Sequence, residues 1–215
     1  MTIRRALDEL RADGLIVSGQ GRRTVVRFAP AVRLVQTGAN YRRRAGSRAG
    51  VSDWSAEVSA QGGRPEERVL EIGWAPAPSD IAELLEVPAG EQVLVRRQLL
   101  VVDRVPSQLS DGYYAAAIAT GTSLELPQHL GEDAASVIEN ELGYVIARFV
   151  EDFSARTPTA VEARVLHMRP RSAIVRTVRT AYDAADLPLE VLDSRQPADR
   201  HTWRYEIPVP PPDAR

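Results

Sequence analysis

The chain contains no cysteine, no lysine and no long apolar run. Without cysteine it forms neither disulfides nor zinc–thiolate sites, and thiolate catalysis is excluded. No segment approaches the ~20 apolar residues that a membrane-spanning helix requires. The N-terminus also lacks the apolar region of a signal peptide. These absences predict a cytoplasmic protein that has no membrane partner.

The absence of lysine means that all 27 basic residues are arginine, against 29 acidic residues and a net charge of −2. Residues 1–50 hold eleven arginines and three acids, whereas residues 51–215 hold 16 arginines and 26 acids. A basic segment joined to an acidic body indicates a polyanionic partner, because nucleic-acid affinity comes largely from neutralised phosphates. The alternative is an arginine-rich solvated surface, as in proteins from GC-rich genomes.

The sequence lacks the residue spacings of the common catalytic motifs. The histidines His129, His167 and His201 are scattered and show no metal-ligand spacing such as HExxH. GxSxG, GxGxxG and phosphate-loop patterns are absent. The carboxylate pairs 132–133 and 151–152 are chain neighbours, so their side chains point in different directions. We therefore predict no catalytic residue, no metal and no cofactor, and an enzyme is the least favoured class.

Residues 1–28 are typical of half of a winged helix-turn-helix. Four apolar residues recur at helical spacing between Ile3 and Leu10, and Gly14 follows as a helix-ending residue. Two short β-prone runs, 15–17 and 24–26, then flank a basic Gly-rich tip. An arginine-bearing helix followed by such a hairpin predicts a recognition helix and its wing.

The remaining chain predicts a linker at 29–52, a domain at 53–207 and a disordered tail at 208–215. The domain's hairpins and short helices favour an α+β fold around a central antiparallel sheet. Ser79, and Thr157 before Pro158, are predicted to begin two of its helices. The expected helices cover residues 80–86, 134–142 and 159–166. The expected strands cover residues 54–60, 68–74, 91–102, 106–114, 144–155, 173–181, 189–196 and 202–207.

Several of these segments together resemble the GntR superfamily of transcription regulators, in its HutC-type branch with a UTRA effector-binding domain. Residues 2–10, 14–16 and 19–26 match that family's recognition helix and wing. In the second part the order and spacing of segments 84–97, 105–110, 156–163, 179–183 and 205–206 carry the resemblance. It implies an effector domain similar to chorismate lyase, assembled as a homodimer. It also implies a ligand-responsive repressor that binds a double-stranded DNA operator.

The resemblance also implies two sets of site residues. Arginine suits guanine edges, threonine suits a phosphate or a thymine methyl, and glycine lets backbone amides approach the duplex. The DNA-binding candidates are Thr2, Arg4, Arg5, Gln20, Gly21 and Arg22. A small polar or anionic metabolite would be held by guanidinium and carboxylate groups on apolar strands. The effector-binding candidates are Arg96, Ser110, Asp111, Arg179, Glu190 and Ser194. The alternative for these is a cross-strand ion-pair ladder.

The sequence departs from the family pattern in two respects. The family's winged helix has two helices before the recognition helix, and this sequence contains neither. Either a longer reading frame begins upstream, or the chain is a headless paralogue that binds an effector or forms heterodimers without binding DNA. In addition, Arg171 and Asp186 stand where the family's glycines are expected.

Overall fold

The computed structural model describes residues 3–12, 16–17, 24–26, 53–127, 134–168 and 171–204. Helix α1 (Ile3–Ala12) is followed by strands β1 (Ile16–Val17) and β2 (Val25–Val26). The two strands pair antiparallel, with Ile16 opposite Val26. The predicted helix and hairpin are therefore confirmed. The expected linker and tail lie outside the described residues.

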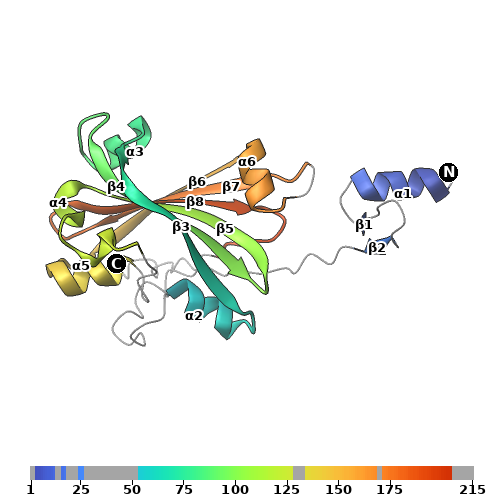
Figure 1. The fold of residues 1–215 in the computed structure, drawn as a ribbon, viewed down its shortest axis with the longest axis horizontal. Coiled ribbons are helices and arrows are strands. Elements are labelled where there is room, and N and C mark those ends of the chain that lie inside the picture. Colours follow the sequence, from blue (N-terminus) through green and yellow to red (C-terminus); the bar gives the residue numbers. More distant parts are fainter. Residues whose placement is uncertain are drawn as a thin grey trace, which may run out of the picture.

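The body of the protein is a six-stranded antiparallel sheet with helices on both faces, which confirms the predicted α+β class (Figure 1). The strand order is β3-β4-β5-β8-β7-β6. Short connections join β4 to β5 and β7 to β8, whereas β5 and β6 are separated by the helical segment between them. The strands are β3 (Pro65–Pro76), β4 (Gln92–Val102), β5 (Val105–Tyr114), β6 (Arg148–Arg156), β7 (Ile174–Tyr182) and β8 (Pro188–Pro197).

Alternation along β4 divides the hydrophobic core between the two faces of the sheet. Val93 and Val95 pack against α3 (Ser79–Leu84), and Leu99 packs in the cluster that contains Leu166 at the end of α6 (Ala160–Val165). Leu94 points the other way and packs on the elements that follow β5. We call these two sides the α3 face and the α5 face; Figure 1 shows α3 and α6 on one side and α2 and α5 on the other. The α5 face carries α2 (Asp53–Ala60), α4 (Ala116–Ala119), the 3₁₀ turn η2 (Ser123–Glu125) and α5 (Ala134–Leu142).

Segment 54–60 is a helix, and its prediction as a strand is wrong. Trp54 and Val58 pack together on Val102. Because they lie four residues apart, they share a face in a helix and in a strand alike. The helix ends in a Schellman motif, with Gly62 at φ +82° and the Gly63 amide donating to the Val58 carbonyl at 3.0 Å. Residues 61–63 thus end a helix rather than turn between two strands.

Two helix starts also differ from the prediction. Thr159, not Thr157, caps α6: its side chain accepts from the Glu162 amide, and the Glu162 carboxylate accepts from the Thr159 amide. At α3 the N-cap position is Pro78, which makes no side-chain cap, so Ser79 is the first helical residue. The signal for α6 was present as a Thr-x-x-Glu capping box.

The remaining predicted elements agree with the structure to within a few residues, with one exception. Helix 134–142 is confirmed at its predicted bounds as α5. The expected last strand at 202–207 is not formed by the described residues 202–204. None of the helices in the described ranges is long and apolar enough to cross a membrane.

Candidate functional site

The N-terminal helix presents two of the predicted DNA-contacting side chains to solvent. Arg4 and Arg5 are exposed on α1, and Arg5 Nε lies 3.4 Å from Glu9 Oε1. Between exposed partners such an ion pair holds the guanidinium only weakly. Ile3 on the apolar stripe is 81% exposed, so this stripe is not fully packed. The other four DNA-binding candidates, Thr2, Gln20, Gly21 and Arg22, lie outside the described residues.

A buried hydrogen-bonded group of polar side chains lies on the α5 face, where β5, β8 and β7 are neighbours. Gln108 Nε2 donates to Ser110 Oγ at 2.9 Å and to Ser194 Oγ at 3.0 Å, and the two hydroxyls are 2.9 Å apart. Gln196 Nε2 donates to Gln108 Oε1 at 2.9 Å, and Thr177 Oγ1 lies 3.4 Å from Gln196 Oε1. We call these five buried residues the central polar cluster.

Only Ser110 and Ser194 of the central polar cluster were predicted from the sequence. Gln108 is two residues before Ser110, and Gln196 is two residues after Ser194, so each pair shares a strand face. That alternation was a signal for both glutamines. Thr177 required the cross-strand register, which places it opposite Ser194.

Arg179 and Glu190, two of the effector-binding candidates, lie together on the same face. Arg179 Nη2 lies 3.8 Å from Glu190 Oε2, and its guanidinium carbon is 4.9 Å from the Phe149 ring centroid. Tyr114 Oη donates to Glu190 Oε1 at 2.7 Å. Burial, together with the nearby Glu190 carboxylate, raises the pKa of Tyr114 well above its usual value. The tyrosine is therefore a neutral hydrogen-bond donor at physiological pH.

Arg96 also lies on the α5 face, where its guanidinium binds the protein itself. Nη1 donates to the carbonyl oxygens of Leu124 and Leu126, the latter at 3.0 Å, and so fastens η2 to the sheet. The pKa of this guanidinium is lowered, because the effect of burial exceeds the opposing effect of the nearby Tyr114. A guanidinium that is already held in this way would need to exchange its partners before it could bind an anion.

Asp111 lies on the opposite, α3 face, away from the other effector candidates. Its carboxylate accepts from Arg97 Nε at 2.9 Å and lies 2.9 Å from Arg195 Nη2. The separation follows from strand geometry, because Asp111 adjoins Ser110 and successive side chains alternate between faces. Grouping Asp111 with Ser110 in one site was therefore wrong.

The carboxylate of Asp111 belongs to a chain of alternating charges that crosses the α3 face. Asp193 pairs with Arg195 at 3.1 Å and with Arg176 at 3.0 Å, and Arg176 reaches Asp80 on α3 at 2.8 Å. For Asp111 the alternative reading as part of an ion-pair ladder is thus confirmed. We call the set the charge ladder: Glu71, Arg97, Asp111, Arg195, Asp193, Arg176 and Asp80.

Ser107 and His201 form a hydrogen-bonded pair that the sequence analysis did not identify. Ser107 Oγ is 3.1 Å from His201 Nε2, and His201 Nδ1 is 3.0 Å from the Pro197 carbonyl oxygen. Burial lowers the pKa of His201 to about 4, so the ring is neutral at physiological pH. Both residues are buried, and a backbone carbonyl stands where a catalytic triad would have a carboxylate. The described part of the chain contains no group of histidine or acidic side chains placed to hold a metal ion.

Residues 60–202 match the UTRA domain family, and the chain belongs to it. One relative, the uncharacterized HTH-type transcriptional regulator SCO4628 of Streptomyces coelicolor, is 28% identical over 97% of this chain and 79% of its own length. A crystal structure of PhnF from Mycobacterium smegmatis shares the fold with a TM-score of 0.66 at 24% identity, over 97% of this chain and 84% of that one.

A further solved relative supports the same placement. It is the ligand-binding domain of a protein from Bordetella bronchiseptica described as a GntR-family transcriptional regulator. It is 28% identical, with a TM-score of 0.61 over 68% of this chain and 90% of that chain. These likenesses place the chain with the GntR-type transcription regulators that carry a UTRA domain; the relatives named are regulators, not enzymes.

Proposed function

We propose that this protein is a cytoplasmic, HutC-type repressor that binds operator DNA as a homodimer and responds to a small polar or anionic metabolite. The observation that carries the proposal is the combination in one chain of a helix–hairpin with exposed Arg4 and Arg5 and a UTRA domain. GntR-type regulators bind DNA operators and small effectors. A two-fold dimer would present two recognition helices to a pseudo-palindromic operator.

The effector would bind at the α5 face of the sheet. The central polar cluster offers hydroxyl and amide groups, and Arg179 and Glu190 offer opposite charges on neighbouring strands. Because these groups are bonded to one another, a ligand would replace existing hydrogen bonds rather than satisfy open ones. Such an exchange favours a ligand rich in hydroxyl, amine or carboxylate groups.

DNA binding is tested by electrophoretic mobility shift on duplexes from the adjacent intergenic region. Arg4→Gln/Arg5→Gln should weaken binding at least about tenfold, because each bidentate base contact is worth about 1–3 kcal/mol. Arg148→Gln is the control, since that arginine is paired with Asp186 on the sheet domain. Equal affinity of the helix variant and the control would contradict the recognition-helix role.

Effector binding is tested by thermal-shift screening of sugar phosphates, amino-acid catabolites and acyl intermediates. Arg179→Gln should abolish the ligand-induced rise in melting temperature, because losing one partner of a desolvated charged contact costs about 2–5 kcal/mol. Asp111→Asn, on the opposite face, should lower the melting temperature without ligand but keep the ligand-induced rise. If both variants retain the wild-type rise, the ligand binds elsewhere.

A second candidate function is supported by the exposure of Ile3 and Leu10 on α1. A helix with an unpacked apolar stripe could bind a partner helix, so that the chain would form heterodimers with a paralogous regulator. Co-purification with such a paralogue, lost in Ile3→Ser/Leu10→Ser but retained in Arg4→Gln/Arg5→Gln, would favour this function over direct DNA binding.

A further inference from the structure

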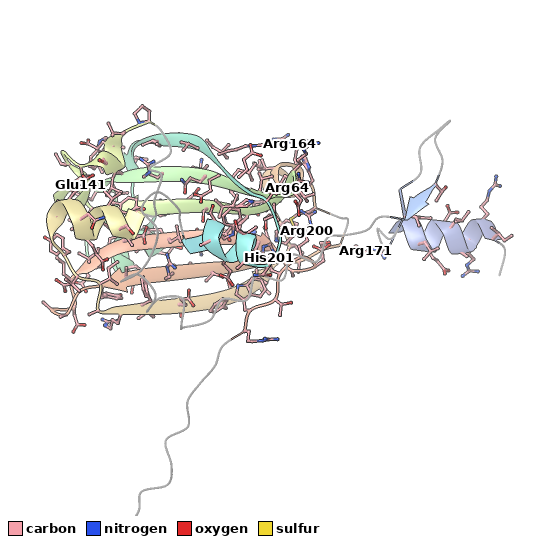
Figure 2. The ribbon with its side chains drawn as sticks, turned by 90° about the horizontal axis from the view of Figure 1, so that it is seen from below. Arg64, Glu141, Arg164, Arg171, Arg200 and His201 are labelled. Atoms are coloured by element: carbon pink, nitrogen blue, oxygen red, sulfur yellow. The ribbon has the colours of Figure 1, made fainter. Side chains whose placement is uncertain are left out.

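One end of the sheet carries exposed arginines from four separate segments. The strand order brings together the residue before β3, the β4–β5 turn, helix α6 and the loop before β7. Figure 2 shows the labelled Arg64, Arg164 and Arg171 at this end. Arg104 is adjacent, because its neighbour Asp103 receives a bond from Arg64 Nε at 3.3 Å. All four arginines are exposed, and we call them the arginine end.

The positive charge of the arginine end is largely uncompensated. Arg64 pairs with Asp103, but the two side chains are 89% and 42% exposed, so solvent screens the pair. Among the residues that the structure describes, the other three members form no ion pair. Other acids near this end are bound to other residues. Glu66 lies 2.7 Å from Arg68, Glu67 accepts from Ser55 at 2.8 Å, Glu162 binds Arg156 at 2.6 Å, and Asp199 lies 4.0 Å from Arg200.

Two members of the arginine end have left-handed backbone conformations, with φ of 67° at Arg104 and 63° at Arg171. This region favours glycine, and a long side chain adopts it only at an energetic cost. Neither guanidinium makes an ion pair within the described residues that would offset that cost. At Arg104 the hairpin accounts for this conformation, because a two-residue turn between antiparallel strands needs positive φ at both of its residues, here Asp103 (φ 50°) and Arg104. The turn thus holds the Arg104 side chain at the tip of the β4–β5 hairpin.

Arg200 holds the arginine end in a fixed arrangement. Its Nη1 donates to the carbonyl oxygens of Pro106 at 2.7 Å and Leu166 at 2.9 Å, and its Nη2 donates to that of His167 at 2.7 Å. One buried side chain thereby ties the start of β5 and the end of α6 to the segment after β8. The surface around Arg104 and Arg164 is thus preorganised, which reduces the entropy lost on binding.

The opposite end of the sheet is acidic, and Figure 2 shows Glu141 there. Arg148 at that end is already paired with Asp186 at 2.8 Å. Such a separation of charge orients a protein in the field of a polyanion, with the basic end toward it. Glu83, Glu91, Glu125, Glu139 and Asp183 are among the other acidic residues on the elements at this end.

We propose that the arginine end binds the phosphate backbone of double-stranded DNA beside the site contacted by α1 and its hairpin. The inference rests on the proposed DNA-binding function and adds a second, sequence-independent contact surface. The four guanidinium groups come from separate segments and are exposed rather than gathered in a pocket. Charges distributed in this way suit the repeated phosphates of a duplex better than one small anion.

The test measures binding of the full chain to a fluorescein-labelled 30-base-pair duplex of arbitrary sequence by anisotropy, between 50 and 200 mM NaCl. Arg164→Gln/Arg171→Asn removes two positive charges, and asparagine tolerates the left-handed backbone at position 171. This variant should bind at least about fivefold more weakly at low salt. Its slope of log affinity against log salt should fall by about 1.8, because each lost phosphate contact removes about 0.9.

Arg148→Glu is the matched control, since it changes the net charge by the same two units at the acidic end. It should leave the salt slope unchanged, and melting curves would verify that both variants are folded. An equal loss of affinity in the control would show that net charge alone matters and would overturn the proposal. A wild-type slope in Arg164→Gln/Arg171→Asn, or a wild-type chain that does not bind the duplex, would also overturn it.

The Arg4→Gln/Arg5→Gln variant separates this inference from the proposed function. If that variant loses operator binding while the arginine-end variant keeps its salt slope, the recognition helix stands and the inference fails. If only the arginine-end variant loses affinity, the inference stands and the role of α1 fails. If the arginine-end variant changes only self-association in sedimentation, the surface binds the acidic end of a second copy, and the DNA proposal is overturned.

Discussion

His201 makes the stability of the fold depend on pH, because its ring is buried in the neutral form. The folded state holds the ring neutral between the Ser107 hydroxyl and the Pro197 carbonyl, with a pKa of about 4 instead of 6.5. Between these values the unfolded chain binds more protons than the folded one. Acidification through this window therefore favours unfolding, and below about pH 4 no further loss arises from this residue.

We predict that His201 lowers the free energy of unfolding by about 3 kcal/mol between pH 7 and pH 4. The magnitude follows from the difference between the two pKa values, since each pKa unit corresponds to about 1.36 kcal/mol. Urea denaturation at several pH values would measure it. His201→Gln, which does not titrate, should flatten the curve in this window. The salt-bridged Glu162, whose pKa is lowered to about 2 by Arg156, loses its contribution only below about pH 4.5. A variant curve parallel to the wild type above pH 4.5 would contradict the assignment to His201.

Single residues also show how far residue types alone can locate a site. Arg179 and Glu190 were both predicted as effector-binding candidates, and they lie together because their strands are neighbours in the sheet. Asp111 and Ser110 adjoin in sequence yet lie on opposite faces of the sheet. Residue type identified the candidates, whereas strand direction decided which of them share a surface.

At the scale of an element, α6 illustrates what fixes a helix start. Thr157-Pro158 is a plausible beginning, because proline suits the first turn. Thr159 is the N-cap because its amide donates to the Glu162 carboxylate. The same carboxylate accepts two hydrogen bonds from Arg156, at 2.8 and 2.6 Å. The capping box is thus joined to the neighbouring strand β6, and the helix begins where both sets of bonds form.

Thr159→Ala should therefore lower the free energy of unfolding by about 0.5–2 kcal/mol, the usual effect of losing an N-cap side chain. Thr157→Ala, two residues earlier, should have an effect within about 0.5 kcal/mol. Chemical denaturation of both variants measures the difference. A larger loss of unfolding free energy in Thr157→Ala than in Thr159→Ala would indicate that Thr157 caps the helix.

At the scale of the whole molecule, the charge ladder links β3, β4, β5, β8 and β7 with α3 across one face of the sheet. Its ends, Glu71 and Asp80, are exposed, whereas Asp111 and Asp193 in its middle are buried. Each buried carboxylate serves two arginines, so removing one leaves guanidinium groups without a counter-charge in a desolvated site. The free energy of unfolding that each ion pair contributes therefore depends on how far the pair is buried.

Asp111→Ala should lower the free energy of unfolding by about 3–5 kcal/mol, as expected for breaking a buried ion pair. Glu71→Ala removes the same kind of charge from the exposed end of the ladder and should change stability by less than about 1 kcal/mol. Guanidinium chloride would screen the ladder, so urea denaturation is the suitable measurement. Similar losses in the two variants would show that burial does not set the strength of these pairs.

Local signals in the sequence were sufficient for the α+β class, for the α1–hairpin segment and for most of the strands, because alternation, turn residues and capping residues act over a few neighbours. They were ambiguous at 54–60, where a four-residue spacing fits a helix and a strand equally. Only the tertiary structure decided that Asp111 lies in the charge ladder, that Arg96 holds η2, and that Arg64, Arg104, Arg164 and Arg171 gather at one end. These relations depend on strand order, register and side-chain burial, which arise from contacts between residues far apart in the chain.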